Sequence, residues 1–272
     1  AADHDGFWLE QATGLIDWMT PPTTACDRSR APFFTWFADG TLNASVNCLD
    51  RHLDTAGDRV AFHWEGEPGD RRSVTYRELH REVCRLANGL RSLGVKRGDK
   101  VAIYMPMVPE LAVAMLACAR IGAVHTLVFA GFSPDSLRDR ILGCDCTVLI
   151  TGDGSHRNGK VVPLKDNADA ARTQCPDVTS CIVVRRTDSE VAWTEGRDHW
   201  YHELIADQPD ECAPEAMNAE DMLYILFTSG STGKPKGIVH TTGGYLTGVA
   251  APHRWAFDVS DDDVYWCAAD VG

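Results

Sequence analysis

The stretch KVAIYMPMVPELAVAMLACARIGAVHTLVF, residues 100–129, decides the fold of this 272-residue chain. Residues 100–105 and 124–129 are apolar runs of strand length, and residues 109–121 between them predict an apolar helix. Strands that are apolar along their whole length are typical of a parallel sheet that is covered by helices on both faces. The stretch therefore predicts an α/β fold.

The neighbouring segments extend the same alternation. Thr75 and Glu78 form the pattern of a capping box, which predicts a helix that begins there and ends at Gly94. Ser133 and Pro134 predict the start of another helix, which runs to about Leu142. Further strands are expected at residues 146–151 and 181–185, with polar connections after about residue 152. Residues 1–60, rich in aromatic residues and prolines, are expected to form an irregular leader that packs across the larger domain.

Composition excludes several classes of function. The chain is 44% hydrophobic, which is enough for a sizeable core, and its net charge of −13 makes a nucleic-acid partner unfavourable. No apolar run approaches the length of a membrane span. The first six residues contain no basic region and no apolar stretch, so we expect no signal peptide.

The ten cysteines are expected to be reduced thiols. They are scattered, none forms a Cys-x-x-Cys pair, and the closest two are Cys144 and Cys146. Several lie in apolar surroundings, where free cysteine behaves as a small hydrophobic residue. We therefore expect neither a disulfide framework nor a zinc site, and a cytoplasmic protein.

A loop for polyphosphate is predicted at TSGSTGKPKG, residues 228–237. Its glycines let the backbone approach a ligand, and its amides, hydroxyls and lysines suit an anion. It is not a Walker A loop, because Thr228 stands where the first glycine is required and Pro235 follows Lys234. Apolar runs at 222–227 and 237–240 place it between two strands. The predicted phosphate-binding residues are Thr228, Ser229, Gly230, Ser231, Thr232, Gly233, Lys234 and Lys236.

A second candidate segment follows the strand expected at 146–151. Ligands of open α/β sheets bind beyond the carboxyl ends of the strands, and Arg157 and Lys160 are two cations that could grip a phosphate there. From position alone, an ordinary solvated loop is the favoured interpretation.

Three other groups of residues favour structural roles. His240 could lie near an acyl group, but a hydrogen-bonded structural histidine is favoured. The acidic run 261–263 favours a solvated turn, because neighbouring residues of a strand point to opposite sides. Residues 50–52, Asp-Arg-His, favour a structural pairing over a catalytic dyad.

The loop at 228–237 resembles the phosphate-binding signature of adenylate-forming enzymes. Four further segments resemble the AMP-forming acetyl-CoA synthetases within that group. They are HTTGGYL (240–246), YWCAADVG (265–272), WFADGTLN (36–43) and NCLDRHL (47–53). The sequence departs from the usual pattern at Phe227, where tyrosine is usual, and at Ala268, where threonine is usual.

The resemblance implies layered α/β sheets, with a leader at 1–60 and the first part of an AMP-binding domain at 61–272. It implies that acetate, ATP and Mg²⁺ give acetyl-adenylate and pyrophosphate, and that coenzyme A then gives acetyl-CoA and AMP. Arg157, Asn158, Gly159 and Lys160 match the segment that contacts the nucleotide end of coenzyme A. Catalytic and acyl-pocket residues would lie downstream of Gly272, so we expect an N-terminal fragment that is inactive alone. No metal ligand is implied within it.

Two alternatives stay open. A relative that uses propionate or another short acid would have the same motifs, because the acyl pocket lies downstream. A nucleotide-binding module without ligase activity would need only the loop. In each case the ligands are small molecules, with neither nucleic acid nor membrane as partner, and the sequence indicates no oligomeric state.

Overall fold

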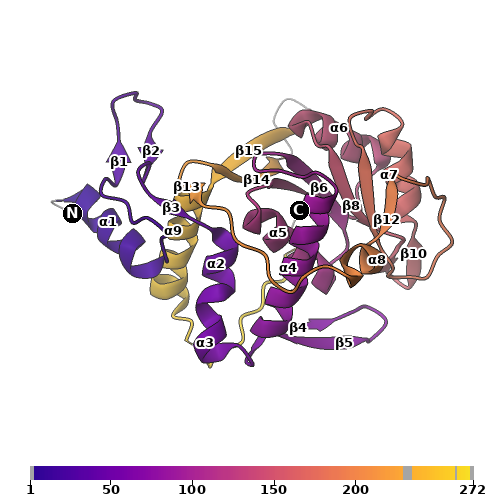
Figure 1. The fold of residues 1–272 in the computed structure, drawn as a ribbon, viewed down its shortest axis with the longest axis horizontal. Helices are drawn as coiled ribbons and strands as arrows, with labels where there is room; N and C mark the ends of the chain where they lie inside the picture. Colours follow the sequence, from indigo (N-terminus) through magenta and orange to yellow (C-terminus); the bar gives the residue numbers. More distant parts are fainter. Residues whose placement is uncertain (1–2, 229–234, 261, 270–272) are drawn as a thin grey trace.

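A computed structural model describes residues 3–228, 235–260 and 262–269 (Figure 1). Its centre is a seven-stranded sheet with the order β12-β11-β8-β6-β7-β14-β15. All neighbouring strands are parallel except β14 and β15, which are antiparallel. The strands are β6 (Lys100–Met105), β7 (Val124–Phe129), β8 (Val148–Gly152), β11 (Ser180–Val184), β12 (Asp198–Trp200), β14 (Met222–Thr228) and β15 (Lys236–Thr241).

Helices cover both faces of this sheet. The central strand β6 alternates, so that Val101 and Ile103 belong to one hydrophobic core while Ala102 and Tyr104 belong to the other. The first core contains α4 (Tyr76–Ser92), α5 (Pro109–Arg120) and α8 (Tyr201–Ala206). The second contains α6 (Pro134–Cys144) and α7 (Leu164–Arg172). The predicted α/β class with a doubly covered parallel sheet is confirmed.

The strongest sequence signals gave the closest boundaries. Strands β6 and β7 have the predicted bounds, and α5 ends one residue earlier than predicted. The capping box of α4 is formed, because the Thr75 amide donates to Glu78 Oε2 at 2.9 Å and the Glu78 amide donates to Thr75 Oγ1 at 3.2 Å. Ser133 caps α6 through a single hydrogen bond, in which its Oγ accepts from the amide of Ser136 at 3.3 Å.

Several elements were not predicted. The segment after residue 152 contains the hairpin of β9 (Ser155–Arg157) and β10 (Lys160–Val162), followed by α7. The expectation of polar connections was wrong there, because α7 hides its apolar residues on one face and is otherwise polar. A second hairpin, β4 (Val60–Glu65) and β5 (Arg71–Thr75), precedes α4.

The N-terminal leader packs against the larger domain, as predicted. A third core joins Ala12 and Leu42 of the leader to Ala119 of α5 and Leu246. The leader also contains elements that its composition did not predict. They are α1 (His4–Leu15), β1 (Cys26–Asp27), β2 (Thr35–Trp36), β3 (Thr41–Leu42), α2 (Ala44–Cys48), the turn η1 (Asp50–His52) and α3 (Leu53–Ala56). Strand β13 (Met217–Asn218), helix α9 (Thr242–Pro252) and the turn η2 (His253–Phe257) complete the fold.

Asp50 ties the leader to the sheet domain. Its two carboxylate oxygens accept from Arg120 at 2.8 and 3.0 Å, and His80 lies 3.5 Å away. Burial alone would raise the pKa of Asp50, but the hydrogen bonds from His80 and Arg120 hold it well below its usual range. The same hydrogen bond to Asp50 raises the pKa of His80 to about 9. Asp50 therefore has a structural role, as predicted, but its partners Arg120 and His80 lie outside residues 50–52, where the pairing was expected.

Other features bear on the expected class of protein. All ten cysteines carry free thiols, and seven of them are buried. Within the described ranges, no helix is long and apolar enough to cross a membrane.

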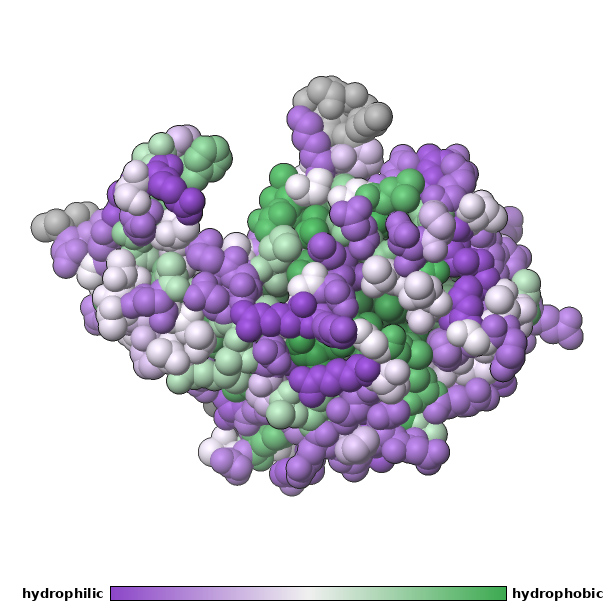
Figure 2. Space-filling model, turned by 45° about the horizontal axis from the view of Figure 1, so that its top comes forward, coloured by the Kyte–Doolittle hydropathy of each residue, from purple (hydrophilic) through white to green (hydrophobic). Residues whose placement is uncertain are grey.

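Strand β15 lies at the edge of the sheet and leaves Ile238 and Val239 about half exposed, at 45% and 49%. Figure 2 shows hydrophobic residues gathered in the middle of one face, between more hydrophilic regions on either side.

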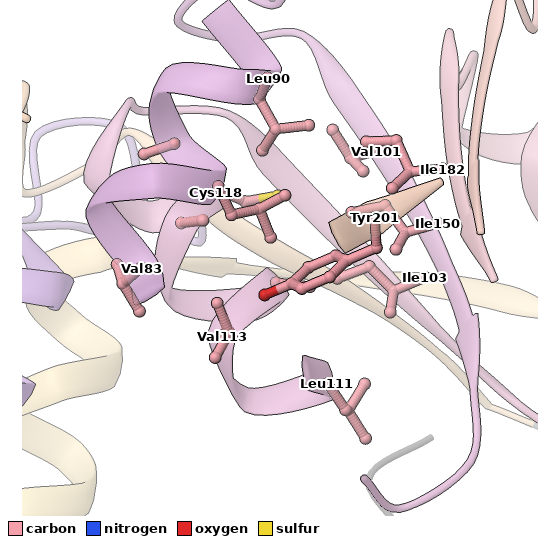
Figure 3. Close-up of a cluster of buried hydrophobic side chains, with 14 of the residues drawn as sticks. Val83, Leu90, Val101, Ile103, Leu111, Val113, Cys118, Ile150, Ile182 and Tyr201 are labelled. Carbon is pink, nitrogen blue, oxygen red and sulfur yellow. The ribbon is translucent and has the colours of Figure 1, made fainter. Parts of the chain in front are cut away.

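Tyr201 is an exception in the first core, because its hydroxyl is buried without a hydrogen-bond partner among the described residues. Figure 3 shows its ring among Ile103, Ile150 and Val113, with the oxygen directed away from β6 towards Val113. Burial raises the pKa of this hydroxyl well above its ordinary value. The hydroxyl therefore costs stability without a compensating contact.

Removing this hydroxyl should stabilise the protein. For Tyr201→Phe we expect the free energy of unfolding to rise by about 1 kcal/mol and Tm by roughly 2–4 °C. Tyr104→Phe is the matched control, because the Tyr104 hydroxyl donates to the carbonyls of Phe132 at 2.8 Å and Ala130 at 3.2 Å. That change should lower the stability, and calorimetry of the two variants measures both effects. A lower Tm for Tyr201→Phe would contradict the assignment.

Candidate functional site

Both segments that are predicted to bind ligands begin at the same end of the sheet, where its parallel strands have their carboxyl ends. Strands β8 and β14 run parallel through β6 and β7, so their carboxyl ends, at Gly152 and Thr228, lie on one side. Three strand spacings separate β8 from β14, which amounts to roughly 14 Å. The described ends of the two segments therefore lie at the same end of the sheet, three strands apart.

The described part of the phosphate segment consists of its two ends. Thr228 is the last residue of β14, Lys236 is the first of β15, and the two lie directly opposite each other. Both side chains are exposed at this end of the sheet. The predicted connection between two strands is confirmed. The remaining predicted residues lie outside the described part of the chain: Ser229, Gly230, Ser231, Thr232, Gly233 and Lys234.

Arg157, Asn158, Gly159 and Lys160 form the tip of the β9–β10 hairpin. Arg157 and Lys160 are paired residues, so the turn consists of Asn158 and Gly159 alone. Their φ angles are 52° and 71°, and a two-residue turn with positive φ at both positions is type I′, which favours Asn-Gly. The segment is therefore an ordered hairpin rather than an irregular loop.

This hairpin holds two cations on one side. Residues directly opposite on paired strands project from the same face, so Arg157 and Lys160 are neighbours there. Both side chains are exposed, and neither has a carboxylate within ion-pair distance in the part of the chain that the structure describes. Like charges directly opposite are unfavourable without an anion between them. The arrangement therefore suits an anionic ligand.

The ring of Phe129 fixes the position of the Arg157 guanidinium. The guanidinium carbon lies 4.7 Å from the ring centre, a distance typical of a cation–π contact. Gly131 provides the room, since a Cβ there would meet Arg157 Nη1 at 2.3 Å. Phe129 ends β7, so Arg157 is oriented before any ligand arrives.

A groove of about 300 Å³ lies beside the hairpin. It is bordered by the residues that follow β6, β7 and β8. The chain turns from β6 towards β7 but from β8 towards β11, so the strand order diverges between β6 and β8, where α/β sheets bind ligands. The lining includes Trp64, Glu67, Pro106, Met107, Phe129, Ala130, Ser155, His156, Arg157 and Arg186.

The β4–β5 hairpin forms the outer wall of the groove. Trp64 donates through Nε1 to the carbonyl of Met107 at 2.7 Å. The Arg186 guanidinium lies 5.0 Å from the Trp64 ring centre and donates to both carboxylate oxygens of Asp70 at 2.7 and 3.0 Å. Hydrogen bonding to Arg186 lowers the pKa of Asp70. The wall is thus anchored to the loops after β6 and β11.

Asp153 organises the loop that carries Arg186. This buried carboxylate accepts from the amides of Gly154 and Arg186 at 2.7 Å, Thr187 at 3.0 Å and Ser189 at 3.1 Å. Backbone amides that converge on one carboxylate hold a loop firmly. Asp153 therefore connects the end of β8 to the end of β11 beneath the groove.

Sequence reasoning missed the residues that complete the groove, namely Trp64, Glu67, Phe129 and Arg186. Each lies far along the chain from the hairpin tip, and no local pattern joins them to it. One signal for the hairpin was available, because Asn158-Gly159 between short runs is a strong mark of a two-residue turn.

The other candidate residues have structural surroundings. The His240 ring stacks on Tyr224 at 4.4 Å between centres, with Tyr245 against its edge at 5.6 Å. Ring stacking, rather than the expected hydrogen bond, is the contact that the structure gives it. Asp263 accepts from the amide of Ser260 at 2.8 Å, as in a turn, whereas Asp261 lies outside the described residues. No three His, Cys, Asp or Glu side chains of the described ranges are grouped to hold a metal ion.

Comparison with known proteins gives matches along the whole chain. The family described as "AMP-binding enzyme" matches residues 49–272, and "Acetyl-coenzyme A synthetase N-terminus" matches residues 1–48. Acetyl-coenzyme A synthetase 2 of Pseudomonas aeruginosa is 56% identical over 270 residues, covering 98% of this chain and 42% of that protein. Acetyl-coenzyme A synthetase of Gemmatimonas aurantiaca is 57% identical over 279 residues, covering 100% and 42%.

A solved structure matches as well. Acetoacetyl-CoA synthetase from Streptomyces lividans superposes with a TM-score of 0.87 and 31% identity, over 94% of this chain and 39% of that one. The chain thus spans about 42% of the length of the curated relatives that it matches.

Proposed function

Because this chain belongs to the AMP-binding enzyme family, with an acetyl-coenzyme A synthetase N-terminus, we propose that it is part of an AMP-forming acetate–CoA ligase. In the first step the acetate carboxylate attacks the α-phosphorus of ATP, and pyrophosphate leaves. In the second step the coenzyme A thiol attacks the acetyl carbonyl, and AMP leaves. The two relatives named above are both called acetyl-coenzyme A synthetase.

The observation that supports the proposal is that the two predicted segments both follow the carboxyl ends of strands, at the same end of the sheet. The residues after β14 would bind the phosphates of ATP, and the β9–β10 hairpin would bind the nucleotide end of coenzyme A. Acetate and ATP are both anionic, so amides and lysines at this end would offset the charge that develops as they meet. This chain would contribute by position and electrostatics, without a covalent nucleophile.

Mg²⁺ would enter with ATP. This ion is commonly bound through one or two carboxylates and the phosphates of a nucleotide. Among the described residues, no three His, Cys, Asp or Glu side chains are grouped to hold a metal ion, and we derive no step through Mg²⁺. The free thiols support a cytoplasmic location.

The function is tested in the complete protein that contains this chain. We expect acetate-dependent exchange of pyrophosphate into ATP, and formation of acetyl-CoA with an equal amount of AMP when coenzyme A is added. A higher kcat/KM for propionate than for acetate would favour the short-chain relative instead. ATP binding without exchange for either acid would indicate a nucleotide-binding module and contradict the proposal.

Charge removal at the hairpin tests the coenzyme A site. For the double variant Arg157→Gln, Lys160→Gln we expect KM for coenzyme A to rise on the order of tenfold, because two cations near the 3′-phosphate are lost. Pyrophosphate exchange should stay within twofold, since that half-reaction needs no thiol. The control is Lys96→Gln, because Lys96 precedes β6 and lies at the amino ends of the strands, away from the hairpin.

Dephospho-coenzyme A distinguishes the 3′-phosphate from the rest of the ligand. The double variant should lose little with this substrate, which lacks that phosphate. An equal loss with both forms of the substrate would show that Arg157 and Lys160 do not read the 3′-phosphate.

A further inference from the structure

The turn between the two cations already holds an anionic group. The amide of Gly159 donates to Glu67 Oε1 at 2.7 Å, and Glu67 belongs to the tip of the β4–β5 hairpin. Glu67 and Gly159 are both exposed, so solvent and ligands can reach this hydrogen bond. A carboxylate therefore occupies the backbone donor at the centre of an otherwise cationic turn.

The same backbone donor suits a phosphate oxygen, because an exposed amide binds either kind of anionic oxygen. The Gly159 amide lies between Arg157 and Lys160 along the chain, so a phosphate that takes this donor arrives at a turn with a cation on each side in sequence. Glu67 forms no ion pair with either cation among the described residues, so its contact with the turn is through the amide. The carboxylate thus occupies the donor without an ion pair to either cation.

The contact does not have the marks of a structural support. Two other contacts anchor the β4–β5 hairpin, the bidentate Asp70–Arg186 pair and the hydrogen bond from Trp64 to Met107. The Asn158-Gly159 turn has the type I′ angles that its own sequence favours. Neither hairpin depends on Glu67 for its shape.

We propose that Glu67 is a specificity-determining residue that competes with the phosphomonoester of the ligand for the Gly159 amide. A ligand with a terminal phosphate must displace the carboxylate, which then lies near the incoming anion and weakens its binding. A ligand without that phosphate leaves Glu67 in place. This inference rests on the proposed function, because it takes the 3′-phosphate of coenzyme A as the group that arrives.

The experiment compares coenzyme A with dephospho-coenzyme A in the complete protein at saturating acetate and ATP, which keeps the adenylate site filled. Glu67→Gln removes the charge and keeps an acceptor oxygen. We expect its KM for coenzyme A to fall about fivefold, the scale of removing one like charge near a surface anion. Its kcat and its KM for dephospho-coenzyme A should stay within twofold. Glu67→Ala, which also frees the amide, should lower KM for coenzyme A at least as far.

Asp58→Asn is the control, because Asp58 precedes β4 at the end of the hairpin away from the groove. Its carboxylate accepts from Arg77 at 2.9 Å, so its charge is already offset. An equal fall in KM for Asp58→Asn, or for both substrates in Glu67→Gln, would indicate a general effect of charge and overturn the inference. A rise in KM for coenzyme A in Glu67→Gln would show that Glu67 supports the turn, and would also overturn it.

The wild-type protein separates this inference from the proposed function. If it uses coenzyme A and dephospho-coenzyme A equally well, the assignment of the hairpin to the 3′-phosphate fails, and the role of Glu67 fails with it. If it prefers coenzyme A while Glu67→Gln leaves that preference unchanged, only the role of Glu67 fails.

Discussion

Lys234→Ala is expected to slow acetate-dependent pyrophosphate exchange about a hundredfold in the complete protein, the scale of losing one donor that stabilises a transition state. Lys234 lies in the predicted phosphate segment between Thr228 and Lys236, the paired ends of β14 and β15. Its ammonium group would face the charge that builds up on the leaving pyrophosphate. Gly233→Val should have an effect of similar size, because its side chain would keep the backbone away from the phosphates.

The control for this measurement is Lys96→Ala, which removes an exposed lysine at the opposite end of the sheet. Its exchange rate should equal that of the unchanged protein. Circular dichroism on each variant separates loss of fold from loss of chemistry. Rates within twofold of wild type in both Lys234→Ala and Gly233→Val would rule out phosphate binding by this segment.

Lys165→Met should destabilise the fold by about 3 kcal/mol, because it breaks a buried ion network. Lys165 is fully buried in α7 and donates to Asp169 at 2.7 Å, to the Ala192 carbonyl at 3.0 Å and to Asp198 at 3.2 Å. Arg197 binds both carboxylates too, at 3.1 Å to Asp169 and 2.6 Å to Asp198. Removing the ammonium leaves the buried Asp198 with Arg197 as its only cation among the described residues, whereas the partly exposed Asp169 keeps Arg197 and Arg172.

The charge balance of this network can be tested by a second change. Lys165→Met with Asp169→Asn removes one charge of each sign and should recover part of the lost stability, so the two effects should not add. Burial alone would raise the pKa of Asp198, but hydrogen bonds from Arg197 and Thr194 and the charge of Lys165 hold it below its ordinary value. Denaturant unfolding gives the free energies. A loss below 1 kcal/mol for Lys165→Met would contradict the assignment.

The parts of the fold that could be predicted from sequence are those that local physics specifies. Strands β6 and β7 are mostly apolar because both faces are buried, and α4 begins at a capping box in which both hydrogen bonds are formed. Helix α7 was missed because its buried face includes Lys165, whose burial depends on partners 27 to 33 positions away. Judged from its neighbours in the sequence alone, a lysine is expected to be exposed.

The candidate site could be predicted only in part, for the same reason. Arg157 and Lys160 stood out as cations after a strand, and the resemblance gave them a ligand. Glu67 and Arg186 carry no local mark, because their relation to the groove arises only when the β4–β5 hairpin meets the sheet. The position of the site at the carboxyl ends of the strands could be predicted, whereas the groove wall that the β4–β5 hairpin forms there could not.

The β4–β5 tip and the sheet edge that it touches are distant along the chain. Glu67 and Gly159 are 92 positions apart, and Asp70 and Arg186 are 116 apart. Closing loops of this length costs entropy that is recovered only after β6, β8 and β11 have assembled. By contrast, α4, β6, α5 and β7 follow one another directly and can associate early. We therefore expect the groove wall to form only after β6, β7, β8 and β11 have paired, because its contacts need the loops that follow these strands in place.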